Sequence, residues 1–440
     1  PFFYNSGVAS IYEYQERRFG SKSRSVISAI FLLSLSFGVA AILYASSLVL
    51  EFITGIDVVY AIFIVTVIAL IYTVMGGITA VIWTDVIQAF ILLVGAIVIF
   101  FGLLDLIPGS LHETLVDLKA EGKTNPLDFS TDFSAVTTVW TGIIAMTAYH
   151  VTVYGINQMM VQRSLAAKTL GDAKKSFLMM GFAAPFIYFL FIFMGILLYA
   201  YYGGREFENG NTIILQFAAD YGVPGLMGLI AAAVMAASMS TMDSALSSMA
   251  TVTTLDFYEK YFKQDASQTH YLKASRVFTV LWGLIIIIPA LMFSQSEGSI
   301  LEVLSKVGSY FVGAKLAMYG LGFFSKHTME KGLLIGVVAG FIIVWYLATY
   351  TDIAWPWFSL IGGCATSIVA WGLSLLLTGR QQEWSPYSIP GQIRKYRLEQ
   401  LEEKQEGWYL IPGKVDKICY VMFGFFLVCM FALYLFNALI

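Results

Sequence analysis

Charged residues are scarce in this chain. Asp, Glu, Lys and Arg make up 12% of its 440 residues, whereas apolar residues make up 58%. Soluble domains contain about 25% charged residues, so this composition excludes a domain surrounded by water. The apolar residues fall in blocks of twenty or more, without the alternation of barrel strands, and a helix needs about 20 of them to cross a bilayer. The composition therefore predicts an all-α integral membrane protein.

Cysteine and histidine are also rare, with three and four copies. Cys364, Cys419 and Cys429 lie inside apolar blocks, where a thiol packs as a small hydrophobe, so neither a disulfide nor a metal site of these ligands is expected. The sequence has no phosphate-binding loop, nucleophile elbow or pair of catalytic carboxylates on a loop. These absences argue against an enzyme and against ATP-driven transport by this chain alone, and no nucleic-acid partner is expected.

Eleven blocks are long enough to be spans, and they predict one transmembrane domain over residues 1–440. Residues 1–25 are expected to form a loop, and because the chain begins with Pro1 and not Met, we expect that N-terminal helices are missing from it. Residues 379–413, rich in Glu, Gln, Lys and Arg, predict an amphipathic connector on the cytoplasmic surface. The predicted spans are 26–52, 57–75, 78–107, 133–163, 174–202, 222–254, 271–294, 299–324, 332–350, 354–378 and 417–439.

Lysine and arginine cluster in alternate loops. If all eleven segments cross, every cluster falls on the same side of the bilayer, and the opposite loops, such as 51–57 and 105–132, are poor in basic residues. The positive-inside rule places the basic side in the cytoplasm. The sequence thus predicts a multi-pass protein of the plasma (cell inner) membrane with its last residue outside. The basic residues of the clusters are Arg17, Arg18, Lys22 and Arg24; Arg163, Lys168, Lys174 and Lys175; Lys260, Lys263, Lys273 and Arg276; Lys326 and Lys331; Arg380, Arg394, Lys395 and Arg397.

A few ionisable residues lie well inside predicted spans. A charged side chain at the bilayer centre costs roughly 3 kcal/mol or more, so each is a candidate for function. Ionisable groups closer to the span ends can extend to the interface. The candidates inside spans are Asp85, Asp243, Lys306, Lys315 and, as a weaker case, His150.

One helix face in the sixth span carries small and hydroxylated residues. Ala237, Ser240, Thr241 and Ser244 recur at positions i, i+3, i+4 and i+7, and therefore share a face. Carbonyl and hydroxyl oxygens are hard donors that suit an alkali cation. The alternative is close helix packing, because small residues at this spacing commonly join transmembrane helices. The pattern alone leaves both interpretations open.

Glycines predict two interruptions. Met75-Gly76-Gly77 separates two long apolar blocks by almost no loop, which predicts a tight re-entry into the membrane. A helix break is predicted near Tyr154-Gly155. Carriers bind their substrates at interrupted helices near the membrane midplane, so the second break is a candidate substrate position.

Several runs resemble the sodium/solute symporter family, which holds the sodium/glucose, sodium/galactose, sodium/proline and sodium/sialic acid carriers. The longest is Tyr72 to Gln88, YTVMGGITAVIWTDVIQ, which looks like the family signature. Further matches are NQMMVQRSLAAK at Asn157–Lys168, ASMST at Ala237–Thr241 and LDFY at Leu255–Tyr258. Their order and spacing fit the family over nearly the whole chain.

The resemblance implies a LeuT-like fold of two inverted five-helix repeats with peripheral helices, working by alternating access with inward sodium flow. It assigns Na⁺ ligands to the carbonyl of Ala237 and the hydroxyls of Ser240 and Thr241, with the remaining ligands on a core helix expected before residue 1. It also implies that Asp85 lines the cytoplasmic exit of sodium. The alternative for Asp85 is a structural ion pair with a base such as Arg163.

The chain departs from family members that have a second sodium site. These members carry an Asp where this sequence has Met159, although two other positions of that site match Asp243 and Ser244. A relocated second cation site is therefore a hypothesis. The alternative is that Asp243 pairs with Lys315.

The predicted substrate pocket also departs from that of sugar carriers. The Asn, Lys and Gln that such relatives use correspond here to His150, to no lysine between Ser176 and Tyr202, and to Ser305, and Val153 replaces the stacking tyrosine. Lysines in this region indicate an anionic solute, unless one extends to the interface and the other pairs with Asp243. The predicted pocket comprises His150, Val153, Tyr154, Asn157, Ser305, Lys306 and Lys315.

The resemblance thus predicts a sodium-coupled secondary symporter that imports a small organic solute, with a sugar or sugar-like compound most similar by family. One alternative is an anionic solute such as a monocarboxylate or sialic acid. Another is a transporter-like membrane sensor, for which no phosphotransfer motif follows the last span. The sequence does not indicate an oligomeric state.

Overall fold

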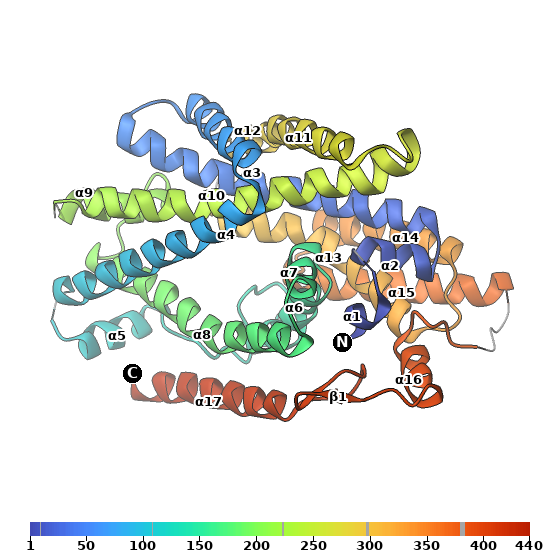
Figure 1. Ribbon diagram of the computed structural model, residues 1–440. Helices are drawn as coiled ribbons and strands as arrows, with labels where there is room; N and C mark the ends of the chain where they lie inside the picture. Colours follow the sequence, from blue (N-terminus) through green and yellow to red (C-terminus); the bar gives the residue numbers. More distant parts are fainter. Residues whose placement is uncertain (9, 108, 222–223, 296–298, 379–382) are drawn as a thin grey trace. The chain divides into compact units, whose positions relative to one another are not determined.

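The computed structural model describes residues 1–440 apart from 9, 108, 222–223, 296–298 and 379–382, and apart from the side chains of 72, 75–85 and 378. The described chain is mainly helical, with one short hairpin (Figure 1), which confirms the predicted helical class. The elements are α1 (Phe2–Ser6), α2 (Ile11–Arg18), α3 (Ser21–Thr54), α4 (Val58–Leu106), α5 (Leu111–Ala120), the π-helix η1 (Thr141–Ala145), α6 (Met146–Gly155), α7 (Gln158–Leu165), α8 (Leu170–Tyr201), the 3₁₀ turn η2 (Gly210–Thr212), α9 (Ile213–Tyr221), α10 (Leu226–Val252), the π-helix η3 (Thr253–Phe262), α11 (Gln268–Ile285), α12 (Ile287–Phe293), α13 (Ile300–Phe324), α14 (Glu330–Tyr350), α15 (Pro356–Thr378), α16 (Ile389–Leu398), β1 (Lys404–Gln405), β2 (Trp408–Tyr409) and α17 (Lys417–Leu439).

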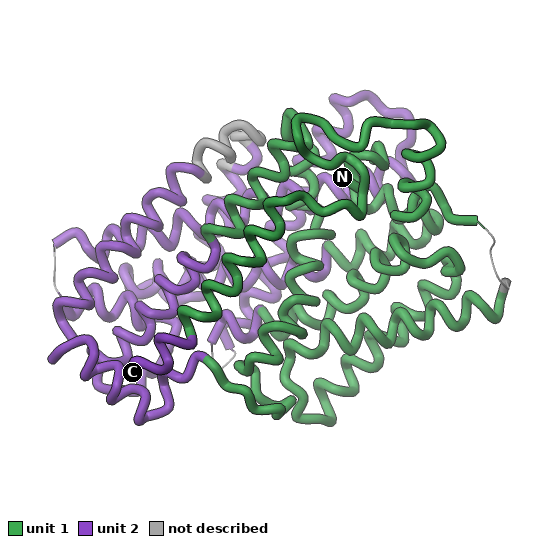
Figure 2. The backbone as a smooth tube through the Cα atoms, turned by 90° about the horizontal axis from the view of Figure 1, so that it is seen from below, with its two compact units in different colours: residues 1–31, 127–183, 305–433 green, residues 32–126, 184–304, 434–440 purple. Residues whose placement is uncertain are grey.

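The chain divides into two compact units, each built from separated segments (Figure 2). Unit 1 holds residues 1–31, 127–183 and 305–433, and unit 2 holds residues 32–126, 184–304 and 434–440. Four of the five boundaries fall inside α3, α8, α13 and α17, and the fifth, at 126/127, lies in the loop after α5.

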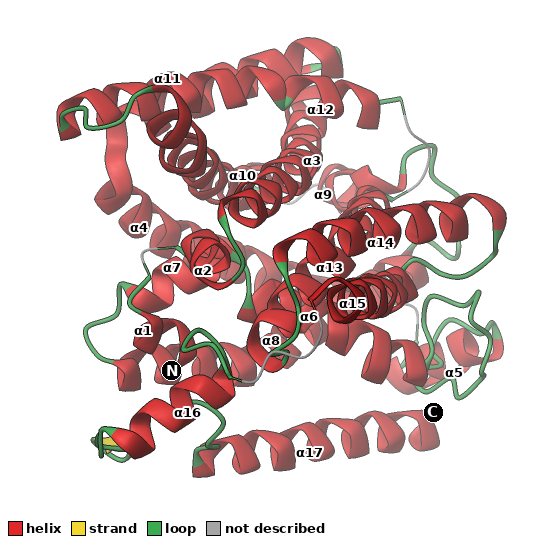
Figure 3. Cartoon of the chain, turned by 90° about the vertical axis from the view of Figure 1, so that its right-hand side faces the viewer, coloured by secondary structure: helices red, strands yellow, loops and turns green. Residues whose placement is uncertain are grey.

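Unit 2 has a core in which small residues let helices approach closely. The second part of α3 packs with α4, α10, α11 and α12, around buried residues that include Ala40, Ala69, Ala245 and Ala290. Both α4 and α11 contact α10 (Figure 3). Small side chains allow this approach because van der Waals contact is a main attraction between helices in lipid. The core therefore fixes the position of α10, which carries the predicted cation ligands.

The prediction of a tight re-entry at Met75–Gly77 differs from the structure. One helix, α4, continues for 49 residues from Val58 to Leu106. Two glycines alone do not end a helix when apolar residues flank them on both sides. This is the physical reason why the prediction failed. The side chains of residues 72 and 75–85 lie outside the described part of the structure.

Unit 1 contains a closely packed pair of helices, α14 and α15, which contact each other along their length. Gly332, Gly336 and Gly340 recur every four residues on α14 and face α15. A Cβ atom added to Gly336 would lie 2.6 Å from the carbonyl oxygen of Thr366. This spacing is the small-xxx-small pattern of close transmembrane packing.

The prediction that residues 1–25 form a loop was wrong. The short helices α1 and α2 occupy much of this segment, and α3 already begins at Ser21. The Ser10 side chain accepts a hydrogen bond from the Glu13 backbone N–H at 3.1 Å and thereby caps α2. Ile11 and Tyr14 of α2 are buried. Tertiary burial and the cap stabilise a helix too short to form alone.

The predicted connector, residues 379–413, contains less helix than expected. Among residues 383–413, α16 is the only helix, a hairpin of β1 and β2 follows it, and the amphipathic pattern therefore extends over ten residues. Within unit 1, Gln392 Nε2 of α16 donates to Ser6 Oγ at 2.8 Å, and Asn5 Nδ2 donates to the Leu410 carbonyl at 2.8 Å. These bonds connect the connector to the amino-terminal helices.

An ion pair joins the connector to the start of α8. Lys174 Nζ lies 2.5 Å from Asp416 Oδ2 and 2.7 Å from the Tyr409 carbonyl oxygen, and the Tyr409 N–H donates to Asp416 Oδ1 at 2.9 Å. Burial alone would raise the pKa of Asp416, but the Lys174 and Tyr409 hydrogen bonds hold this pKa below its usual range. The Asp416 carboxylate is therefore charged at neutral pH.

Eight helices among the described residues are long and apolar enough to cross a bilayer. Three of the eleven predicted spans lack this property. The span predicted at 57–75 contains a shorter apolar helix, Val58–Ile71. The span predicted at 133–163 is broken into η1, α6 and α7. The span predicted at 299–324 corresponds to α13, which is more polar. The number of crossings stays a prediction.

We expect Gly336→Val to lower the thermal stability of the protein, because its side chain would press on the α15 backbone. Overpacking of this kind costs about 1–3 kcal/mol. The matched control is Gly372→Val on α15, where a Cβ atom meets nothing within 4 Å. Unfolding of both variants in detergent, followed by tryptophan fluorescence, checks this, and equal melting temperatures would contradict the packing described for α14.

Candidate functional site

The predicted cation ligands of α10 lie in unit 2. Thr241 Oγ1 donates to the Ala237 carbonyl oxygen at 3.1 Å, so two of the three predicted oxygens lie side by side. Thr241 is exposed, while Ala237 and Ser240 are half-buried. One helical turn of α10 therefore presents carbonyl and hydroxyl oxygens on an open face.

Asp243, two residues further along α10, lies in a buried environment. Its side chain is 3% exposed and its Oδ1 lies 2.5 Å from Thr73 Oγ1 of α4. The same threonine oxygen lies 2.7 Å from the Ala69 carbonyl oxygen. A hydroxyl carries one proton, so it cannot serve both acceptors fully.

The remaining residue predicted for this second cation site is Ser244. It is half-buried on α10, and its carbonyl oxygen accepts from Ser248 Oγ at 2.7 Å. Asp85, predicted on the sodium exit path, lies outside the residues whose side chains are described. Its role and the alternative pairing with Arg163 stay predictions.

A broken helix organises the predicted substrate pocket in unit 1. Helix α6 ends at Gly155, and α7 begins at Gln158 after Ile156 and Asn157. Asn157 Oδ1 accepts from the Met159 N–H at 2.9 Å and caps α7. The break predicted near Tyr154-Gly155 is therefore confirmed. It exposes backbone and a carboxamide where a continuous helix would show only side chains.

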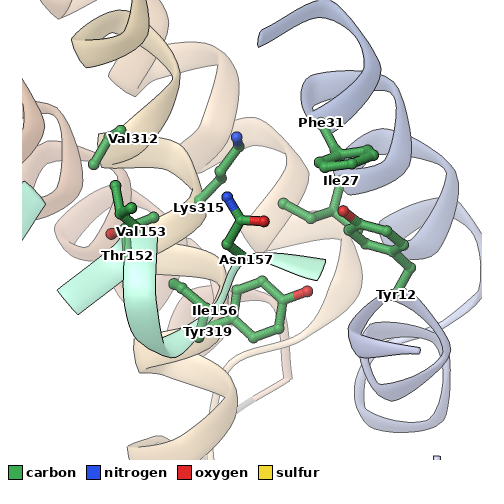
Figure 4. Close-up of a pocket in the computed structure, with 10 residues that line it drawn as sticks. All are labelled: Tyr12, Ile27, Phe31, Thr152, Val153, Ile156, Asn157, Val312, Lys315 and Tyr319. Carbon is green, nitrogen blue, oxygen red and sulfur yellow. The ribbon is translucent and has the colours of Figure 1, made fainter. Parts of the chain in front are cut away.

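A cavity of about 40 Å³ lies beside this break (Figure 4). Figure 4 shows the Lys315 side chain of α13 and the Asn157 carboxamide projecting into the same space, with the Tyr12 hydroxyl facing them. None of the ten lining residues is acidic. The volume is enough for about three water molecules or a small charged head group. The lining residues are Tyr12, Ile27, Phe31, Thr152, Val153, Ile156, Asn157, Val312, Lys315 and Tyr319.

Three of the seven predicted pocket residues, Val153, Asn157 and Lys315, line this cavity, and the other four do not. The His150 ring stacks on the Tyr154 ring at a centroid distance of 5.6 Å. The other two residues precede the cavity on α13. Of these, Ser305 is half-buried and Lys306 is exposed.

Seven lining residues were not predicted from the sequence, among them Tyr12, Ile27, Phe31 and Tyr319. Tyr12 lies in the segment 1–25, for which the sequence predicted a loop. The Ser-x-x-Glu pattern at Ser10–Glu13 is a helix-start signal that would have predicted α2. Ile27, Phe31 and Tyr319 belong to helices whose apolar faces give no sign of which residues border a cavity.

The cavity wall is stabilised by hydrogen bonds between distant segments of unit 1. Tyr319 OH donates to the Ile11 carbonyl oxygen at 2.9 Å, and Gln158 Oε1 accepts from the Ile11 N–H at 3.1 Å. The residue before Tyr12 is therefore fixed by α7 and α13 together. The Tyr319 hydroxyl proton is used in this bond, so the cavity polarity comes from other groups.

Comparison with known proteins gives the family. A family model described as the sodium:solute symporter family matches residues 1–340. The sodium/sialic acid symporter NanT of Aliivibrio fischeri is 30% identical over 380 residues, which are 84% of this chain and 74% of NanT. The sodium/glucose cotransporter of Vibrio parahaemolyticus is 30% identical over 372 residues, 77% of this chain and 66% of that protein.

Other relatives differ in their solutes. Human sodium-coupled monocarboxylate transporter 1 is 30% identical over 354 residues, which are 78% of this chain and 57% of that protein. The chain thus spans less than two thirds of the glucose and monocarboxylate relatives.

A solved structure supports the fold. It shows a Na⁺-coupled sialic acid symporter in a substrate-bound, outward-open state, and it matches 87% of this chain and 80% of that chain, with 26% identity and a TM-score of 0.77. The predicted LeuT-like fold is therefore confirmed. Because the family model covers more than three quarters of its residues, the chain belongs to the sodium:solute symporter family.

Proposed function

We propose that this protein is a sodium-coupled secondary symporter of the plasma membrane that imports a small organic solute by alternating access. The observation that carries the proposal is the oxygen-bearing face of α10, where Thr241 Oγ1 and the Ala237 carbonyl lie 3.1 Å apart. The family consists of transporters, and we infer transport for this chain and not an enzymatic reaction or a sensor role.

Sodium is the cation that suits this face. Its predicted ligands are the Ala237 carbonyl and the Ser240 and Thr241 hydroxyls, all hard oxygen donors. None carries a formal charge, so the site would attract a monovalent ion without holding it too strongly for release. Because all three oxygens come from one turn of α10, further ligands must come from another segment.

We expect Ser240→Ala and Thr241→Val to raise the sodium concentration required for half-maximal uptake by about tenfold, because each removes one oxygen ligand, worth roughly 1.4 kcal/mol. The measurement is uptake in proteoliposomes with an inward sodium gradient. Ser238→Ala is the control, since Ser238 is buried on a different face of α10. If uptake by the unaltered protein does not depend on the sodium gradient, sodium coupling is refuted. If sodium activates both variants as it activates the unaltered protein, this ligand assignment is refuted.

A second cation position is supported at Asp243. Its carboxylate, the Thr73 hydroxyl and the Ala69 carbonyl form a compact set of oxygens. A cation would compensate a buried carboxylate, whose charge is otherwise costly in the membrane. We therefore propose that Asp243 and Ser244 contribute to a second cation site, with Thr73 as an additional ligand from α4.

We expect Asp243→Asn to lower the Hill coefficient of sodium-driven uptake toward one while the sodium response of the first site persists. The amide keeps the shape and the hydrogen bond with Thr73 but removes the charge. Thr73→Val tests the same site from α4 and should act in the same direction. A Hill coefficient that is unchanged in both variants would show that Asp243 serves only the packing of α10 on α4.

Two solute classes remain candidates. Sugars are supported by the sodium/glucose relative, and anionic solutes by the relatives that carry sialic acid and monocarboxylates. The cavity at Lys315 favours an anion. Lysine supplies only donors, the Asn157 oxygen is already occupied by Met159, and no acidic residue lines the wall.

The amino terminus of α7 adds to this preference. It begins at the cavity, and the partial positive charge of a helix amino terminus stabilises an anion by about 0.3–1 kcal/mol. At about 40 Å³, the cavity accommodates a carboxylate head group but not a whole sugar in this conformation. We therefore place the anionic solute ahead of the sugar.

We expect Lys315→Met to raise the KM for pyruvate or N-acetylneuraminate at least tenfold, with little effect on the sodium dependence, because it removes the countercharge and keeps the length of the side chain. Lys306→Met is the matched control on α13, since Lys306 is exposed. Uptake of labelled sugars and carboxylates under the same gradient distinguishes the candidates. Sugar uptake that survives Lys315→Met, without carboxylate uptake in the unaltered protein, would reverse our order of preference.

A further inference from the structure

A second, larger cavity lies in unit 2, at the carboxyl end of α8. It measures about 350 Å³, within the range of small-molecule sites. Its wall combines the apolar residues Leu198 and Ile214 with Tyr202, Arg205 and Phe207. It shares no residue with the Lys315 cavity or with the predicted sodium ligands, so the proposed transport function does not account for it.

Two glycines direct Arg205 to this cavity. Gly203 and Gly204 follow α8 with φ values of +57° and +73°, a left-handed conformation that costs a residue with a side chain about 1–2 kcal/mol. They reverse the chain, and the Arg205 N–H donates to the Tyr202 carbonyl at 3.1 Å. Arg205 therefore returns over the end of α8 instead of extending away from it.

A hydrogen-bond network fixes the aromatic wall. Tyr202 OH donates to Asp220 Oδ2 at 2.7 Å, and Gln216 Nε2 donates to Asp220 Oδ1 at 2.7 Å. The Tyr202 and Phe207 rings meet edge to face, with centroids 4.8 Å apart. Burial and the bond to Asp220 raise the pKa of Tyr202, so its hydroxyl stays protonated at neutral pH. These contacts hold the Tyr202 side chain against Phe207 and Asp220.

Arg205 is the positive group of this cavity. Its guanidinium carbon lies 5.2 Å from the Phe207 ring centroid, and in the described part of the chain no carboxylate or carbonyl accepts a hydrogen bond from its guanidinium. Each oxygen of the nearby Asp220 already accepts a hydrogen bond. Glu206 and Glu208 are neighbours in sequence but do not line the cavity. A guanidinium in this setting suits a carboxylate, which it can bind through two parallel hydrogen bonds.

The side of the membrane follows from α8 itself. Its first turns carry Lys174 and Lys175, and the positive-inside rule places this end in the cytoplasm. The helix has 32 residues and is long enough to cross, so its carboxyl end and the cavity face the outside.

We propose that this cavity is an outer binding site for a carboxylate-bearing organic solute, which is bound by Arg205 and packs its apolar part on Tyr202 and Phe207. The site would raise the solute concentration at the outer face before transport. Only the identity of the solute rests on the function proposed above, and binding itself requires no sodium gradient.

The experiment uses a thiol in the cavity. Gly195 lines the cavity on α8, and a Cβ atom there meets nothing within 4 Å. In the full chain carrying Cys364→Ser, Cys419→Ser and Cys429→Ser, Gly195→Cys is labelled in intact cells with two impermeant reagents. These are the anionic 2-sulfonatoethyl methanethiosulfonate and its cationic trimethylammonium counterpart.

We expect the anionic reagent to react about tenfold faster than the cationic one, because a local positive charge concentrates anions. Arg205→Gln should abolish this preference. Millimolar pyruvate, benzoate or N-acetylneuraminate should slow the labelling, whereas galactose should not. The control is Thr54→Cys, at the exposed end of α3, where Arg205→Gln should leave the ratio of rates unchanged.

Three results would overturn the proposal: no labelling from outside, a charge preference that is independent of Arg205, or no protection by any of the carboxylates. Because labelling needs no transport, a failure of sodium-driven uptake leaves these outcomes unaffected. If carboxylates slow the labelling but sodium drives no uptake, the outer site is supported and the symporter proposal is refuted. If sodium drives uptake but no carboxylate slows the labelling, the symporter proposal is supported and the outer site is refuted.

Discussion

The cost of leaving a polar group unsatisfied in a medium without water is the constraint on which the rest of this structure depends. Hydroxyl groups inside the helices find a hydrogen-bond partner in their own helix. Ser47 and Thr66, for example, donate to the carbonyl four residues earlier. Groups that cannot be satisfied within their own helix need partners from other segments. Asp243 does so through Thr73 of α4, and Ile11 through Gln158 and Tyr319. These few polar contacts link elements that are otherwise joined by apolar packing, and they coincide with the candidate sites.

The polar groups of the two units differ in character, with mainly oxygen acceptors in unit 2 and mainly hydrogen-bond donors in unit 1. In unit 2, α10 presents carbonyl, hydroxyl and carboxylate oxygens, which attract cations. In unit 1, the broken helix α6–α7 and Lys315 border a cavity rich in donors, which suits an anionic group. A symporter needs both kinds of site, and coupling requires that each ligand favours the same state of the protein. If the two proposed sites are both occupied, cation and anion ligands on different elements would together stabilise one arrangement of the helices.

The sequence predicted some of these features well because their causes are local. The composition determines the membrane class, since no fold in water could cover so much apolar surface. The break beside Gly155 also has a local cause, because α6 ends at Gly155 and the Asn157 side chain caps α7. Other predictions failed where tertiary contacts decide. Much of the described part of residues 1–25 is helical, with Ile11 and Tyr14 buried, and α4 stays helical through Gly76-Gly77, where a break was expected.

The sequence by itself determined the helical membrane class, the family and which face of α10 carries the proposed oxygen ligands, because hydropathy, long motifs and helical periodicity are properties of adjacent residues. Only the tertiary structure decided that Lys315 shares a cavity with Asn157 and Tyr12, that Asp243 meets Thr73, and that Arg205 returns over the end of α8. These pairings join residues far apart along the chain or depend on the backbone angles of two glycines. A cavity exists only where several helices leave space between them, so the sequence of any one helix does not predict it.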